Sequence, residues 1–191
     1  MAPRARRVGG AAAACAALLA AAAAPAARAW PGDDGSEALA AVEVFRHGDR
    51  TPIATFATDA YQPATWLTEP GQLTPRGMRA HYETGERLRK RWGDDWLGSY
   101  SPSKVFVRST DVNRTLQSAF SQLAGLFPEG TGPLAYAPAH PDEPRPTGVR
   151  ANEPALPNRG QPVAITSVAA PRDHMLRAWD NCGRFREYPP L

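Results

Sequence analysis

The sequence is poor in cysteine and has no long apolar run after residue 29. Its 191 residues include only two cysteines, Cys15 and Cys182. No stretch of 18 or more apolar residues occurs beyond residue 29, so no membrane-spanning helix is expected there. The four histidines are scattered, and neither an H-E-x-x-H nor a C-x-x-C pattern occurs. We therefore expect no metal site and no cofactor.

The segment 1–29 lacks acidic side chains altogether. It contains four arginines, an Ala/Leu-rich run over residues 8–24 and an A-x-A sequence at residues 27–29. A basic start, a short apolar stretch and small residues at the cleavage position are typical of a secretory signal peptide. We expect residues 1–29 to be removed, which predicts a protein of the secretory pathway, either lysosomal or extracellular.

The formal charge of +3 belongs largely to that leader. Four of the 22 basic residues and none of the 19 acidic residues lie within it, so the rest of the chain carries 18 basic and 19 acidic side chains. A mature chain close to neutral argues against nucleic acid as a partner.

Cys182 is the one cysteine left after the leader is removed. An odd cysteine in a secreted chain implies a partner in a missing part of the chain, an intermolecular disulfide or a free thiol. Since Cys182 lies nine residues from the end, a continuation of the chain could supply its partner in a disulfide. This is the first indication that the chain is a fragment.

Two strand-turn-helix units are predicted between residues 39 and 127. The apolar run at 39–45 (LAAVEVF) predicts a strand buried on both faces, and 104–107 predicts a second strand. Residues 74–92 carry apolar side chains every three or four positions, with Thr74 as N-cap and Pro75 in the first turn, which predicts an amphipathic helix.

The second helix follows the second strand. Its apolar residues are Leu116, Phe120, Leu123 and Phe127, and one of the three residues at 109–111 is expected to cap it. Repeated units of this kind predict an α/β fold with parallel strands, whose ligands lie beyond the carboxyl ends of the strands. The polar turns at 46–52 and 108–111 fall at that edge.

The remainder of the chain is irregular. Residues 128–162 contain nine prolines and no periodicity, which predicts a loop. A further strand is expected within 163–168 and a short helix or turn within 172–179.

The turn Arg46-His47-Gly48-Asp49-Arg50-Thr51-Pro52 carries the strongest chemical signal. Arg108 brings a third guanidinium to the same sheet edge, and this planar fork suits phosphate oxygens. Three guanidinium groups around one imidazole predict a phosphate site with a histidine nucleophile. A histidine attacks phosphorus through a neutral ring nitrogen and forms a phosphohistidine that water hydrolyses.

These residues resemble the histidine acid phosphatases, in particular the prostatic and lysosomal branch. The matching text is VEVFRHGDRTPIATFATDAYQ, GQLTPRGMRAHYETGERLRKRW and VFVRSTDVNRTLQSAFSQLAGLFP, with a weaker resumption at DHMLRAWDNCGRF. The resemblance implies that His47 accepts phosphate and that Arg46, Arg50 and Arg108 bind it, without metal. The family's late His-Asp pair, which binds phosphate and protonates the leaving alcohol, is missing from this chain.

The resemblance also implies a three-layer α/β sandwich of the phosphoglycerate-mutase type with a helical cap. We expect residues 30–170 to be the N-terminal part of the phosphatase core, including the loop at 128–162, and 171–191 to begin a truncated cap domain.

The predicted function is acid phosphatase hydrolysis of small phosphate monoesters. The alternatives are a catalytically silent phosphate-binding or interaction fragment that lacks the general acid, and a phytase or inositol polyphosphate phosphatase of the same superfamily. Assembly into homo-oligomers stays open at this point.

Overall fold

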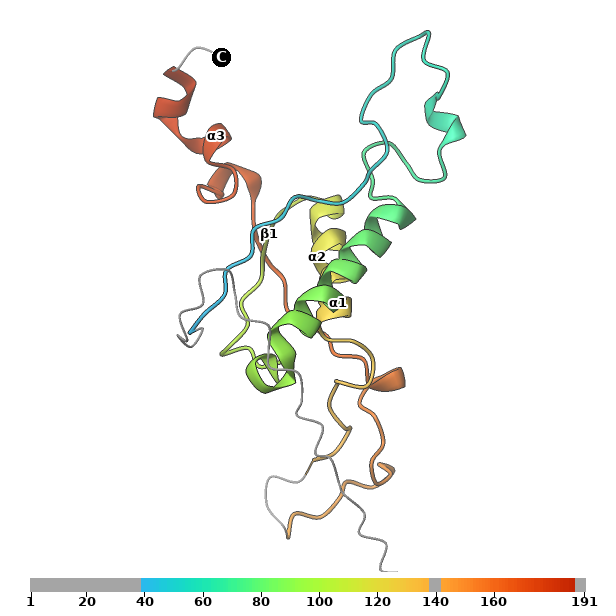
Figure 1. Ribbon diagram of the computed structural model, residues 1–191, viewed down its shortest axis with the longest axis vertical. Helices are drawn as coiled ribbons and strands as arrows, with labels where there is room; N and C mark the ends of the chain where they lie inside the picture. Colours follow the sequence, from blue (N-terminus) through green and yellow to red (C-terminus); the bar gives the residue numbers. More distant parts are fainter. Residues whose placement is uncertain (1–38, 138–141, 188–191) are drawn as a thin grey trace, which may run out of the picture.

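The computed structural model describes residues 39–137 and 142–187, so the predicted signal peptide lies outside the described residues. Two longer helices, α1 (Pro75–Leu97) and α2 (Asn113–Leu126), lie beside the short strands β1 (Arg108–Thr110) and β2 (Thr166–Val168). Figure 1 shows the two helices at the centre of the molecule. The remaining elements are short: η1 (Pro63–Thr65), η2 (Pro157–Arg159), η3 (Ala170–Arg172), α3 (Ala178–Asn181) and η4 (Gly183–Glu187).

Helix α1 begins where the sequence predicted. The Thr74 side chain accepts a hydrogen bond from the Gly77 amide (3.1 Å), and Pro75 occupies the first turn. A side-chain acceptor at the N-cap and a proline with its preset φ both favour helix initiation. The helix ends at Leu97, five residues beyond the predicted end at 92, and Gly98 follows with a positive φ of 60°.

Helices α1 and α2 pack with their backbones in close contact. A Cβ atom added to Gly85 would lie 2.0 Å from the Gln122 carbonyl oxygen, and one added to Gly125 would lie 2.0 Å from the Tyr82 carbonyl oxygen. Only glycine therefore permits this approach at either position.

Helix α2 differs from its prediction in its cap and in part of its buried face. Val112 occupies the N-cap position without a side-chain hydrogen bond, so the prediction of a cap at residues 109–111 was wrong. Phe120 is 65% exposed, whereas Ala119 and Leu123 are buried. The core cluster contains Leu97, Leu123, Leu126 and Phe127.

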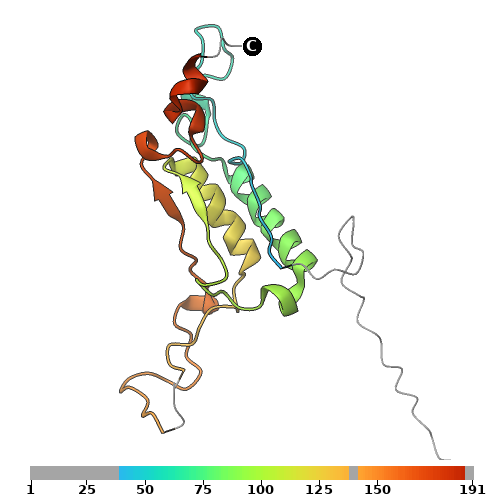
Figure 2. The ribbon, with the colours of Figure 1, turned by 90° about the vertical axis from the view of Figure 1, so that its left-hand side faces the viewer.

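Strands β1 and β2 form a two-stranded parallel sheet. Arg108 pairs with Thr166, Ser109 with Ser167, and Thr110 with Val168. Figure 2 shows α1 and α2 on one side of this pair. The parallel pairing and the strand within 163–168 agree with the predictions, and the result is a small part of an α/β fold.

The prediction of a strand at residues 39–45 was wrong for this structure. The segment has no strand pairing, and Leu39, Val42 and Val44 are 87–92% exposed. The second predicted strand also shifts, because β1 begins only at Arg108. A strand needs a neighbour for its backbone groups, and within the described residues the backbone of 39–45 forms no hydrogen bond with another backbone segment.

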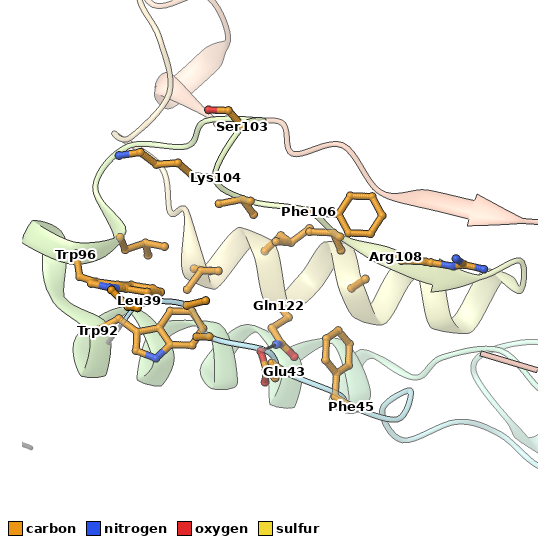
Figure 3. Close-up of a pocket in the computed structure, with 18 residues that line it drawn as sticks. Leu39, Glu43, Phe45, Trp92, Trp96, Ser103, Lys104, Phe106, Arg108 and Gln122 are labelled. Carbon is orange, nitrogen blue, oxygen red and sulfur yellow. Dashed lines mark hydrogen bonds between the residues drawn. The ribbon is translucent and has the colours of Figure 1, made fainter. Parts of the chain in front are cut away.

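A groove of about 600 Å³ lies between the segment at residues 39–45 and the segment at residues 103–108. Figure 3 shows Leu39, Glu43 and Phe45 along one side and Lys104, Phe106 and Arg108 along the other. Gln122 of α2 lies between them, and Trp92 and Trp96 of α1 lie at one end. The apolar residues that were expected inside a sheet therefore line an open groove.

The proline-rich segment is largely irregular, as predicted. Within its described part it contains η2 and one isolated bridge between Leu134 and Pro154. The short helix or turn predicted within 172–179 overlaps the end of η3 and the start of α3, and η4 lies beyond the predicted range. None of the helices in the described ranges has the length and hydropathy needed to cross a membrane.

Candidate active site

His47 lies in the turn that follows the extended segment, and its ring is half-buried. Its Nδ1 lies 2.8 Å from the Gly48 carbonyl oxygen. Because a carbonyl oxygen can only accept, Nδ1 carries the proton in this contact. In the neutral ring the lone pair is then on Nε2, which is the nitrogen able to act as a nucleophile.

The turn around His47 is fastened to both long helices. The Gly48 amide donates to Ser118 Oγ of α2 (3.0 Å), and Ser118 is fully buried. A Cβ atom on Gly48 would lie 2.8 Å from the Gly77 carbonyl oxygen of α1 and 2.9 Å from the His81 ring. The absence of a side chain at Gly48 therefore permits the backbone to approach α1.

Asp49 joins the same turn to the start of α1. Its carbonyl oxygen accepts from the Thr74 amide (3.0 Å), and its carboxylate accepts from Thr74 Oγ1 (2.7 Å). The buried Thr51 donates to the Glu69 carbonyl oxygen (2.6 Å). These contacts hold the backbone on both sides of His47 in one position.

A hydrogen-bond network holds the segment that precedes the turn. Gln122 Nε2 donates to Glu43 (2.7 Å), and Gln122 Oε1 lies 2.9 Å from His81 Nδ1. The His81 ring packs against Phe45, with ring centroids 5.3 Å apart. Partial burial of the carboxyl raises the pKa of Glu43, although the Gln122 hydrogen bond and the nearby His81 act in the opposite direction.

Three of the four predicted site residues line one cavity of about 500 Å³, namely Arg46, His47 and Arg108. Arg46 is exposed, and Arg108 is the first residue of β1. The fourth, Arg50, does not line this cavity; it donates to the Thr51 carbonyl oxygen within its own turn (2.8 Å).

Arg108 forms an ion pair that the sequence did not reveal. Its Nη2 donates to Asp173 Oδ1 (2.7 Å), and Asp173 has no solvent exposure. The Leu176 amide donates to the same oxygen (2.9 Å). The Leu176 amide and the Arg108 guanidinium together hold the pKa of Asp173 below its usual range, despite the opposing effect of burial.

Two further arginines line the cavity and were absent from the predicted site. Arg114 lies in the first turn of α2, and its Nε is buried without a hydrogen-bond partner. Arg177 precedes α3 and donates to Asp180 (2.8 Å). The V-R-S-T-D-x-x-R spacing was a signal for Arg114, since it places this arginine in the first turn of the helix that follows β1. Leu176 and Trp179 complete an apolar wall on the same side.

Other candidate groups do not gather at this cavity. In the described ranges, no three His, Cys, Asp or Glu side chains come close enough together to hold a metal ion. Cys182 is exposed, and it has no disulfide partner among the described residues. His140 lies outside the described part of the chain, and His174 is exposed.

Comparisons with known proteins identify relatives of this chain. The chain is 42% identical to human prostatic acid phosphatase over 145 residues, which is 75% of this chain and 33% of that protein. It is 37% identical to human lysosomal acid phosphatase over 134 residues, 70% of this chain and 27% of that protein. The chain thus spans about a third of the length of these relatives.

A solved structure of a Klebsiella phytase aligns with 21% identity and a TM-score of 0.46, covering 70% of this chain and 28% of that one. The family described as the histidine phosphatase superfamily (branch 2) matches residues 39–189. The chain therefore belongs to branch 2 of the histidine phosphatase superfamily.

Proposed function

We propose that this polypeptide carries the nucleophile half of an acid phosphatase that hydrolyses phosphate monoesters through a phosphohistidine at His47. The observation that supports the proposal best is the cavity at which the half-buried His47 meets Arg46 and Arg108. Its similarity to prostatic and lysosomal acid phosphatases supports the same class of substrate. Arg50 is the remaining candidate, and its guanidinium must turn away from Thr51 to reach a ligand in the cavity.

The proposed first step is in-line attack of His47 Nε2 on the phosphorus atom. The Nε2–P bond forms as the P–O bond to the alcohol breaks, and the leaving oxygen takes up a proton. Water then attacks the phosphohistidine, which releases inorganic phosphate and restores the imidazole. The guanidinium groups of Arg46 and Arg108 balance the negative charge on the equatorial oxygens in both steps.

The proton for the leaving alcohol needs a separate donor. Glu43 is the acidic residue among those lining the cavity, but its carboxylate accepts a hydrogen bond from Gln122 Nε2 of α2 (2.7 Å). Asp173 is buried and ion-paired. We therefore assign neither as the general acid and expect a His-Asp pair from a longer chain to supply the proton.

The proposal extends to the fold and the compartment of the complete protein. We expect the helix pair and the small parallel sheet to be one part of a three-layer α/β sandwich with a helical cap. We also propose that the protein enters the secretory pathway, because segment 1–29 has a signal-peptide pattern and one group of relatives is named lysosomal.

Turnover of an aryl phosphate at about pH 5 tests the proposed nucleophile. An aryl leaving group needs little protonation, so attack by His47 is detectable even without the general acid. We expect His47→Ala to abolish the protein-dependent rate and His174→Ala, a matched change at an exposed histidine, to preserve it. Mass spectrometry after an alkaline quench should find phosphate on the peptide that contains His47. Equal rates for wild type and His47→Ala would refute the proposal.

A silent phosphate-binding fragment is the second candidate, because neither Glu43 nor Asp173 is assigned as the general acid. Loss of a general acid typically costs about 10²- to 10⁴-fold in rate. A silent fragment would bind inorganic phosphate in calorimetry but turn over neither an aryl nor an alkyl phosphate. Turnover of the aryl ester alone would indicate a working nucleophile without its acid.

A further inference from the structure

Asp173 is the buried partner of Arg108, although 65 residues separate them in the sequence. Its carboxylate has no solvent exposure and lies at the start of the segment that carries Leu176, Arg177 and Trp179. Through one oxygen it accepts from both Arg108 Nη2 (2.7 Å) and the Leu176 amide (2.9 Å). A single carboxylate thus joins a candidate phosphate ligand to the wall of the candidate site.

We propose that Asp173 is a positioning residue that fixes the Arg108 guanidinium for phosphate and seats the 173–179 segment against the cavity. The proposal rests on the proposed function of His47 and Arg108. It assigns to Asp173 no contact with the substrate and no proton transfer.

The geometry favours positioning over competition with phosphate. A competing carboxylate would have to be displaced by the ligand, but Asp173 is buried and also held by the Leu176 amide. A guanidinium has five N–H donors in a fixed fork, and the recorded bond to Asp173 uses one of them. Arg108 Nε is buried without a hydrogen-bond partner, so the other N–H groups on Nη1 and Nη2 are the donors that can face a phosphate while the pair stays intact.

The same contact couples the phosphate site to the apolar wall formed by Leu176 and Trp179. Asn181 of α3 donates to the carbonyl oxygens of Ala170 (2.8 Å) and Asp173 (3.0 Å), which closes the segment into a compact turn. Leu176 and Trp179 then line the cavity that contains His47. Loss of the Asp173 carboxylate would release both the guanidinium and this apolar wall.

Two substitutions at Asp173 distinguish the effect of its hydrogen bonds, which position Arg108, from the effect of its negative charge. Asp173→Asn removes the charge but keeps an acceptor oxygen for Arg108 and Leu176, whereas Asp173→Ala removes both. Asp180→Ala is the matched control, because it removes the partner of Arg177 at the same cavity. The probe is inorganic phosphate, measured by calorimetry with the full chain.

We expect Asp173→Ala to weaken phosphate binding about tenfold or more, as for loss of a hydrogen bond to a charged group. Asp173→Asn should stay within about threefold of wild type, and Asp180→Ala within about twofold, because the position of Arg108 is retained. Tighter binding by both Asp173 variants would show that the carboxylate merely neutralises Arg108, and would overturn the proposal. A folded Asp173→Ala variant with unchanged affinity would overturn it as well.

The wild-type protein provides a readout that needs neither a folded Ala variant nor bound phosphate. Nitrogen-15 NMR should resolve separate, slowly exchanging Nη protons for Arg108 and averaged signals for the exposed Arg46. Averaged Arg108 signals would contradict the positioning role. A wild-type chain that binds no phosphate but shows a fixed Arg108 would instead contradict the proposed function, so the two failures are distinguishable.

Discussion

The helix pair α1–α2 and the extended segment at residues 39–45 are both rich in apolar residues, yet they differ in burial. Leu123, Leu126 and Phe127 are at most 8% exposed, whereas Leu39 and Val42 are 92% exposed. A helix satisfies its backbone groups within itself and needs a neighbour only for one face. A strand needs neighbours for its backbone and for both faces, so an incomplete sheet leaves it exposed. The candidate site lies at the boundary, because His47 follows the exposed segment and Ser118 of the helix pair holds its turn.

The largest expected change in stability comes from a substitution in the core between the helices, and comparing it with one in the exposed segment tests the difference in burial. Leu123→Ala removes a side chain from the core cluster and should lower the free energy of unfolding by about 2–5 kcal/mol. Val42→Ala, in the exposed segment, should change it by less than about 0.5 kcal/mol. Urea unfolding followed by circular dichroism measures both. Similar losses for the two variants would show that residues 39–45 are packed in solution.

The backbone contact between the helices gives the next largest effect. Gly125→Ala would place a Cβ atom 2.0 Å from the Tyr82 carbonyl oxygen, so the helices must separate. We expect a loss of about 1–3 kcal/mol, even though alanine is the better helix former. Gly183→Ala is the control, since no atom lies within 4 Å of its added Cβ. Unfolding midpoints that move equally in the two variants would contradict the close packing.

The sequence predicted the features that depend on local contacts. The Thr74 cap and Pro75 lie within one turn of the helix they start, and the parallel strand at 166–168 lies in its predicted range. The strand at 39–45 was mispredicted because its burial depends on neighbours distant in sequence. The Arg108–Asp173 pair was missed for the same reason, as no local pattern marks two residues that far apart.

The positions of three candidate site residues were predicted from the sequence, and the position of the fourth was not. Arg46 and His47 are adjacent, and Arg108 directly follows the strand that was predicted at 104–107. All three were therefore expected at one edge of the sheet. The same motif suggested that Arg50 would join them, but the turn directs its guanidinium to the Thr51 carbonyl oxygen. Contacts of a long flexible side chain depend on the folded turn and cannot be inferred from spacing.

Protonation of Asp173 in acid should lower the free energy of unfolding of the protein. Its pKa is lowered from the ordinary 3.8 by the Leu176 amide and by Arg108. A lowered pKa contributes stability that is present above the ordinary value and is lost as the pH falls through the lowered one. Stability measured between about pH 6 and pH 2 should therefore fall less steeply in Asp173→Asn than in wild type. Parallel pH profiles would exclude this contribution.

Glu43, within the exposed segment at residues 39–45, should show the opposite and smallest effect on stability. Partial burial raises its pKa above the ordinary 4.5, so its contribution to stability is present below that value and is lost as the pH rises through the raised one. Glu43→Gln keeps an oxygen that can accept from Gln122, and it removes the partly desolvated charge. The variant should therefore be slightly more stable than wild type at neutral pH and indistinguishable from it in acid. Glu83→Gln, in an exposed i,i+4 pair with Arg79, should instead be slightly less stable at neutral pH. A Glu43→Gln variant that loses stability at neutral pH would mean that the carboxylate charge itself holds this segment to α2.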